Sequence, residues 1–256
     1  DLMKWFLLTH VRKLFRLWCI LGAVLWLVGV LLRPDAPTAL LLLWMLWIQA
    51  GFWGGNLFAG WMCILAFRRL DEDCDPEPLL AVSRSVLAQN PNACCYRVYE
   101  AWALSLLGRQ EEAAAAAALA EGRRRLWRKP RLLLLWSAAL PPGDPRRERA
   151  EAALERFAGR KLGRHRAMIR SALERQRIYA QMSRGADELE PALLAALEQA
   201  GCTREQVGAH LALGLYCLQR GDTARAQAHL SFVAAHGNKL KVREEAERLL
   251  CCMPAV

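Results

Sequence analysis

Residues 39–67 read ALLLLWMLWIQAGFWGGNLFAGWMCILAF and contain no charged side chain. The run is twenty-nine residues long, whereas a helix needs about 20 apolar residues to cross a bilayer. Upstream, residues 17–32 (LWCILGAVLWLVGVLL) form a second uncharged run, which reaches spanning length if Leu14 and Phe15 are counted and Arg16 extends its charge towards the head groups. The two runs predict a pair of transmembrane helices, with spans at about 14–32 and 39–67.

The first run follows a basic start, as the apolar core of a signal peptide also would. However, the connection at 33–38 (RPDAPT) offers no small-x-small cleavage site, and the second run follows at once. We therefore expect both helices to be retained as a membrane hairpin over residues 1–69.

Basic residues flank the outer ends of the two runs, namely Lys4, Arg12, Lys13, Arg16, Arg68 and Arg69. The connection between the runs carries only Arg33, opposed by Asp35. Because positive flanks stay on the cytoplasmic side, we expect both termini in the cytoplasm and an integral protein of the plasma or inner membrane. The nine cysteines contain no C-x-x-C pair, which agrees with a reducing compartment.

Small residues recur at four-residue spacing in the second run, as Gly51, Gly55 and Ala59. Such a row lets two helices approach closely. Gln49 and Asn56 are seven residues apart and point to nearly one side, where an amide facing lipid needs a polar partner. These five residues predict a helix contact, for which three partners fit: the first run, a second copy of the chain, or another membrane protein. Tryptophans near the expected interfaces are interpreted as anchors, namely Trp5, Trp18, Trp44 and Trp61.

The rest of the chain predicts an all-α domain. Residues 70–78 are acidic and contain two prolines, which indicates a linker. From 79 to 256 no stretch alternates as a strand does, and Pro, Gly and Asn separate helical patterns. About ten helices are expected, near 79–90, 93–107, 110–126, 130–140, 145–158, 163–182, 187–200, 203–219, 222–236 and 239–251. Their short connections favour antiparallel hairpins.

Two of these hairpins share a spacing of small residues around a glycine. Ala101 lies seven residues before Gly108, as Gly214 lies before Gly221. After the glycine, small or apolar residues follow at matching steps, namely Ala113, Ala117 and Ala120 in one hairpin and Ala226, Leu230 and Val233 in the other. This pattern resembles the tetratricopeptide repeat, in which small residues let two antiparallel helices cross closely. The resemblance is good at 207–236, moderate at 79–120 and poor at 121–200, and it implies an α-solenoid, with a plain helical bundle as the alternative.

The resemblance also implies where a partner would bind. In that family the first helix of each repeat lines a concave groove, and clamp-type members hold a peptide's terminal carboxylate there with Lys, Arg and Asn. The matching positions here are Val98, Trp102, Ser105, Leu211, Leu215 and Leu218. A groove of this kind would prefer an amphipathic helix or an extended apolar segment. Alternatively, these side chains are buried against neighbouring helices.

A basic cluster at Arg123, Arg124, Arg125, Arg128, Lys129 and Arg131 surrounds Trp127. Such a cluster can bind anionic lipid or RNA, or it is a solvated helix end. Lipid is favoured and nucleic acid disfavoured, because a membrane is expected beside it and the part after residue 69 carries only half of the net charge of +10, which is a modest excess.

We find no sequence signature of catalysis, of a bound cofactor or of a metal site. Cys202, His210, Cys217, His229 and His236 cluster in the sequence but lack the spacing of a metal site, and the usual catalytic and nucleotide-binding motifs are missing. We therefore expect a protein that is not an enzyme: a membrane-tethered scaffold or adaptor that binds another protein. The alternative is an accessory or regulatory subunit held in a larger membrane complex through its hairpin.

Overall fold

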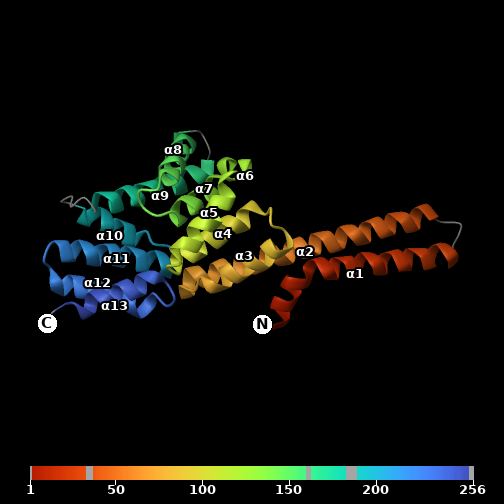
Figure 1. Cartoon of the computed structure of the whole chain (residues 1–256), viewed down its shortest axis with the longest axis horizontal. Helices are drawn as coiled ribbons and strands as arrows, with labels where there is room; N and C mark the ends of the chain where they lie inside the picture. Colours follow the sequence, from red (N-terminus) through yellow and green to blue (C-terminus); the bar gives the residue numbers. More distant parts are fainter. Residues whose placement is uncertain (1, 33–36, 160–162, 183–188, 254–256) are drawn as a thin grey trace.

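The computed structural model describes residues 2–32, 37–159, 163–182 and 189–253. These residues form thirteen α-helices and no strand (Figure 1), which confirms the all-α prediction. Helices α1 (Leu2–Leu32) and α2 (Pro37–Asp73) lie antiparallel and project from the other helices. The segments Leu14–Leu32 and Thr38–Asp73 are long and apolar enough to cross a membrane.

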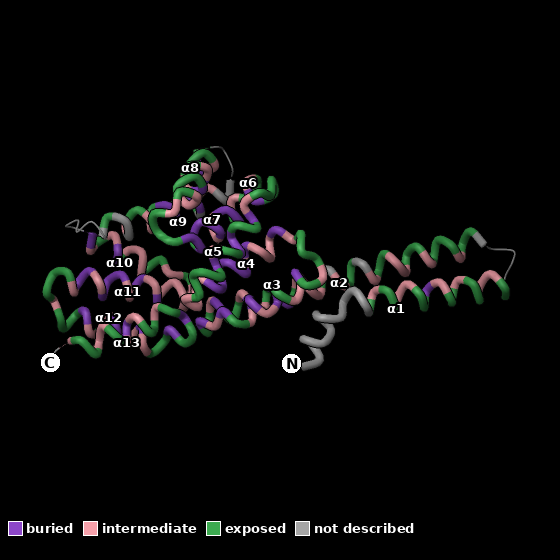
Figure 2. Tube along the Cα trace, in the orientation of Figure 1, coloured by how far each residue is buried: buried purple, intermediate pink, exposed green. Residues whose placement is uncertain are grey.

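Apolar side chains are exposed along the projecting hairpin. In the described part of the chain, Leu119 and Leu194 are the only exposed large apolar residues outside α1 and α2. Buried residues gather instead among the other helices and along the C-terminal part of α2 from Met62 onward, which we call its lower end (Figure 2).

Helix α2 continues past the hairpin into the core of the remaining helices. Met62, Cys63, Ala66 and Leu70 are buried there, with Leu70 fully enclosed. The last turns of the span predicted at 39–67 therefore pack against protein, although they also belong to the apolar segment Thr38–Asp73. The boundary predicted at residue 69 lies within one unbroken helix.

The acidic segment at 70–78, predicted as a linker, packs against the C-terminal helices. Cys74 is fully buried. Arg204 Nε donates to Asp71 Oδ1 (2.9 Å), Asn238 Nδ2 donates to the Asp73 carbonyl (2.7 Å), and Lys239 Nζ donates to Asp75 Oδ2 (3.0 Å). The segment thus joins the hairpin to the C-terminal part of the chain.

Helices α3 to α13 and the lower end of α2 form the helical domain. The helices are α3 (Glu77–Gln89), α4 (Cys94–Leu106), α5 (Gln110–Glu121), α6 (Arg124–Arg128), α7 (Pro130–Ala139), α8 (Pro145–Gly159), α9 (Gly163–Met182), α10 (Glu190–Glu198), α11 (Thr203–Gln219), α12 (Thr223–His236) and α13 (Lys241–Cys251). These are eleven helices where ten were predicted. The helix expected at 110–126 divides because α5 ends at Glu121, with Gly122 as its C-cap, and Arg123 is extended (φ −91°, ψ 115°).

The helical hairpins α4–α5 and α11–α12 turn in the same way. Their glycines, Gly108 and Gly221, have φ of +78° and +77°, a conformation that favours glycine. The residue after each glycine donates its N–H back to the helix, from Arg109 to the Leu104 carbonyl (2.9 Å) and from Asp222 to the Cys217 carbonyl (3.0 Å). The shared spacing of small residues around the two glycines therefore corresponds to the same turn geometry in both hairpins.

Candidate partner-binding surfaces

Two tryptophans join the helices of the hairpin. The rings of Trp18 and Trp47 stack with centroids 3.9 Å apart, at an interplanar angle of 10°. Each indole N–H donates to the other residue's carbonyl, at 2.8 Å from Trp18 and 3.0 Å from Trp47. Each ring also covers a glycine, because a Cβ on Gly51 would lie 2.6 Å from Trp18 Cδ1 and one on Gly22 would lie 2.5 Å from Trp47 Cδ1. Trp18, predicted as an interface anchor, is therefore part of the contact between α1 and α2.

The five residues predicted as a helix contact occupy different surroundings. Gly51 lies under Trp18 at the seam between α1 and α2, and Gly55 is half-buried. Ala59 packs against the core of the helical domain. Gln49 is exposed on the hairpin, whereas the side chain of Asn56 lies outside the described residues.

The residues expected to line a groove are packed to different degrees. Val98 is fully buried and Trp102 is 7% exposed. The Trp102 ring stacks on Phe67 of α2 (6.0 Å between centroids), and the Arg204 guanidinium lies over it at 5.2 Å. A partner cannot reach these two side chains, because Val98 is fully enclosed and α2 and the start of α11 cover Trp102.

The other four groove candidates are only half-buried, namely Ser105, Leu211, Leu215 and Leu218. Leu211 and Leu218 pack against the core of the helical domain. The structure therefore does not bring the six candidates together on one open surface.

A cleft of about 660 Å³ opens where α2 enters the helical domain. Its lining comes from α2 and from the connection between α10 and α11, namely Ile64, Phe67, Arg68, Asp71, Glu72, Ala200, Gly201, Cys202, Thr203 and Gln206. Burial raises the pKa of the neighbouring Cys74 thiol to about 11 and also raises the pKa of Cys202. Both thiols therefore stay protonated at neutral pH and are poor nucleophiles.

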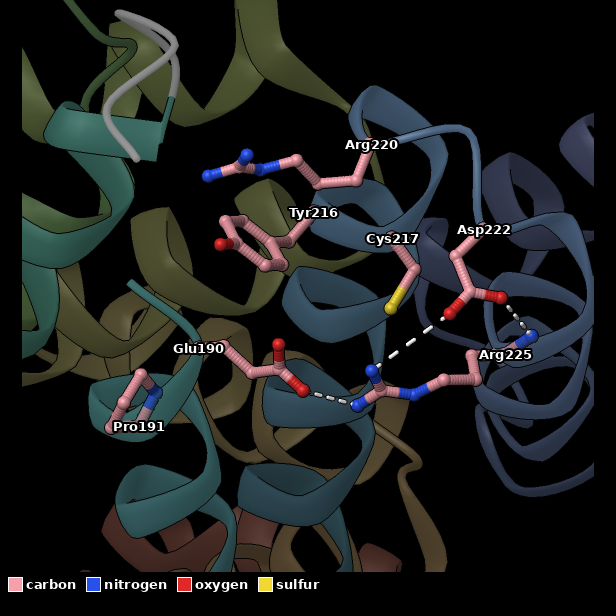
Figure 3. A pocket seen from close by; sticks show the side chains of 7 residues that line it. All are labelled: Glu190, Pro191, Tyr216, Cys217, Arg220, Asp222 and Arg225. Carbon is pink, nitrogen blue, oxygen red and sulfur yellow. Dashed lines mark hydrogen bonds and ion pairs between the residues drawn. The ribbon is translucent and has the colours of Figure 1, made fainter. Parts of the chain in front are cut away.

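A second cleft, the α10–α11 cleft, has a volume of about 560 Å³ and is shown in Figure 3. Its lining residues are Glu190, Pro191, Tyr216, Cys217, Arg220, Asp222 and Arg225. The guanidinium of Arg225 bridges the carboxylates of Glu190 and Asp222. The Arg220 guanidinium lies 5.4 Å from the centre of the Tyr216 ring. Tyr216 itself is only 6% exposed, so the cleft mainly offers charges of both signs.

Sequence reasoning missed the α10–α11 cleft. Glu190 and Arg225 are thirty-five residues apart, and neither belongs to a recognisable motif. Charged residues beside a helical turn are common on solvated surfaces, so only their juxtaposition in space distinguishes them.

The six cations predicted as a lipid-binding cluster are exposed in the structure, and we call them the basic segment: Arg123, Arg124, Arg125, Arg128, Lys129 and Arg131. Trp127, which lies among them, is packed instead. Its Nε1 donates to the Glu121 carbonyl (3.0 Å), and its ring meets Trp136 edge to face at 5.8 Å. Trp127 is therefore held by the protein and is not free to insert into a membrane.

Histidines of α11 and α12 form a stack. His210 Nδ1 lies 2.9 Å from His229 Nδ1, and the Phe232 ring lies between His210 (4.0 Å) and His236 (4.2 Å). Burial lowers the pKa of both His210 and His229. Within the described residues, no group of three or more His, Cys, Asp or Glu could hold a metal ion.

Comparison with known proteins gives no indication of what these surfaces bind. No known family matches this chain, and no curated protein or solved structure is significantly similar to it.

Proposed function

We propose that this chain is a membrane-anchored adaptor that binds another protein. In this proposal α1 and the upper part of α2 span the bilayer, and the helical domain lies in the cytoplasm. The domain, an α-solenoid in the manner of tetratricopeptide repeats, presents the α10–α11 cleft to a peptide of the partner.

One observation supports the anchoring above all others: exposed apolar side chains line both helices of the hairpin. Leu17, Leu31 and Leu46 are 62%, 75% and 65% exposed. Exposing apolar surface to water costs about 25 cal/mol per Å², whereas contact with lipid tails would carry no such cost. The indole N–H groups of Trp18 and Trp47 agree with this environment, because polar groups in a bilayer must be satisfied within the protein, whereas the buried indole nitrogens of Trp26 and Trp44 have no hydrogen-bond partner among the described residues.

The continuity of α2 determines how the domain would be held. Because one helix belongs to both the hairpin and the buried core, the domain would be mounted rigidly and not through a flexible linker. Arg204 and Lys239 add contacts to the acidic segment that follows. The orientation rests on the basic flanks of the hairpin, since positive flanks stay inside.

The α10–α11 cleft supports partner binding through its composition. Arginine is enriched among the residues that dominate protein interfaces, and here the exposed Arg220 lies at the cleft over the buried ring of Tyr216. Arg225, Glu190 and Asp222 supply charges that would set the register of a polar peptide.

Affinity purification in mild detergent tests the proposal. An Arg220→Glu variant should recover at least about tenfold less of the bound client, because losing an interface hot spot costs about 2 kcal/mol or more. Arg243→Glu, on α13, is the matched control and should recover as much client as the parent protein. Equal recovery by all three proteins would reject the cleft as the binding surface.

A second candidate function, an accessory subunit of a membrane complex, is favoured by Gln49. Its side chain is exposed within the apolar hairpin, where an amide needs a polar partner from another membrane helix. If this candidate is correct, Gln49→Leu will release a stoichiometric membrane partner while the cleft variant retains it.

A further inference from the structure

The basic segment lies at the end of the helical domain from which the hairpin projects. In Figure 1 the long axis of the molecule is horizontal, and α6 lies towards the hairpin, whereas α12 and α13 lie towards the opposite end. Arg123 Nη2 donates to Asn92 Oδ1 (2.7 Å) in the connection between α3 and α4. These positions place the segment beside the membrane surface that the proposed anchoring implies.

The charges of the segment face outwards and are unpaired. Leu126 is fully buried, and Arg124 and Arg128 lie two residues before and after it, which places them on the opposite side of the helix. Across the described residues, none of the six cations has a carboxylate partner. The adjacent Glu121 pairs instead with Arg149 (3.3 Å).

We propose that the basic segment binds the anionic head groups of the membrane in which the hairpin sits. This inference rests on the proposed membrane anchoring. Clusters of Lys and Arg beside a transmembrane helix are attracted to anionic lipid, and salt screens the attraction. Because Trp127 is packed, the contact is electrostatic, at the level of the head groups, and involves no insertion of an aromatic ring.

Single-stranded RNA is the competing ligand for such a surface. Proteins that bind it combine positive charge with exposed aromatic rings on which bases stack. The aromatic residue within this segment, Trp127, is half-buried: its N–H donates to the Glu121 carbonyl, it packs against Trp136, and the Arg149 guanidinium lies over its ring at 5.8 Å. The surface therefore provides charge without a stacking platform, which favours lipid.

Hydrogen exchange of the full chain in lipid nanodiscs tests the inference. Peptides covering 121–132 are compared in discs of phosphatidylcholine and in discs that also contain phosphatidylglycerol. We expect exchange in this region to be several-fold slower in the anionic discs, and high salt to remove the difference. Arg124→Gln/Arg128→Gln should lose most of the protection, whereas the matched control Arg243→Gln/Arg248→Gln, on α13, should keep it.

Three results would overturn the inference. Equal exchange of the parent protein in neutral and anionic discs would show that the segment does not bind anionic lipid. An equal loss of protection in the control pair would show that net charge, and not this surface, is responsible. Stronger protection by single-stranded RNA in neutral discs than by anionic lipid would assign the surface to nucleic acid. Failure of the chain to enter any disc is a separate result, which would reject the membrane anchoring itself and the inference with it.

Discussion

Replacing Gly51 with alanine should loosen the contact between α1 and α2. The new Cβ would lie 2.6 Å from Cδ1 and 2.7 Å from Nε1 of Trp18, so the ring must move. Its movement would break the stack on Trp47 and the bond to the Trp47 carbonyl. Aromatic pairs contribute about 0.5–1.5 kcal/mol, and interhelical hydrogen bonds in membranes contribute about 0.6 kcal/mol. Crowding adds about 1–3 kcal/mol, which gives a total of about 2–5 kcal/mol.

Gly54 provides the matched control on the same helix. A Cβ at Gly54 would meet no atom within 4 Å. Alanine favours a helix over glycine by about 1 kcal/mol at either position, so this effect cancels when the two variants are compared. The difference between the variants therefore reports the Trp18 contact alone.

Unfolding of the hairpin can be followed by titrating sodium dodecyl sulfate into dodecylmaltoside micelles. Stacked indoles give an exciton-coupled circular dichroism signal, which should disappear when the hairpin opens. Gly51→Ala should open at a clearly lower fraction of dodecyl sulfate than Gly54→Ala. Equal midpoints, with the signal intact in Gly51→Ala, would refute the contact.

Three further predictions concern the stability of the helical domain. His210 and His229 are half-buried, and this partial burial lowers the pKa of each. Below about pH 6.5 the unfolded chain therefore binds more protons than the folded chain does. The stability that depends on the two neutral histidines is complete above that pH and is lost as the pH falls. The melting temperature should drop between pH 7.5 and 5, and a smaller drop in His229→Gln would support the assignment, whereas an unchanged drop would contradict it. Glu100 is 8% exposed and accepts hydrogen bonds from Arg84 (3.3 Å) and Arg97 (3.1 Å). Because both arginines are partly exposed, Glu100→Gln should lower the free energy of unfolding by about 1–2 kcal/mol in a denaturant titration. An unchanged midpoint would show that these ion pairs contribute nothing to stability. Gly221→Ala should destabilise the helical domain by about 1–2 kcal/mol, because Gly221 has a φ of +77°. Gly122 has a φ of −68° and open space around it, so Gly122→Ala should be neutral or slightly stabilising. A lower melting temperature for Gly122→Ala than for Gly221→Ala would contradict this reasoning.

Local features of the sequence determined most of the secondary structure. The uncharged runs at 17–32 and 39–67 predicted two long apolar helices, and the Pro, Gly and Asn breaks predicted nearly all of the others. The glycines of two turns were identified from spacing alone, because a left-handed residue between two helices is a local requirement. The one additional helix, α6, is too short to show a periodicity of its own.

The candidate sites could be predicted only in part. The basic segment was identified from composition, since exposed charge needs no particular neighbour. Val98 and Trp102 carry the spacing of groove residues, yet Val98 is fully enclosed and α2 and α11 cover Trp102, and no local pattern indicates which helix packs there. The α10–α11 cleft joins residues of separate helices, so it had no signature at all.

The sequence by itself determined that the first part of the chain is apolar and helical, that the rest is helical, and where the cations lie. Only the tertiary structure decided where α2 leaves the hairpin, which tryptophans pair across it and which polar groups meet in a cleft. The physical reason is that a lipid tail and a protein core are both apolar surroundings. The run at 39–67 suits either of them, and only the position of the neighbouring helices shows that Met62, Cys63 and Ala66 are buried in protein.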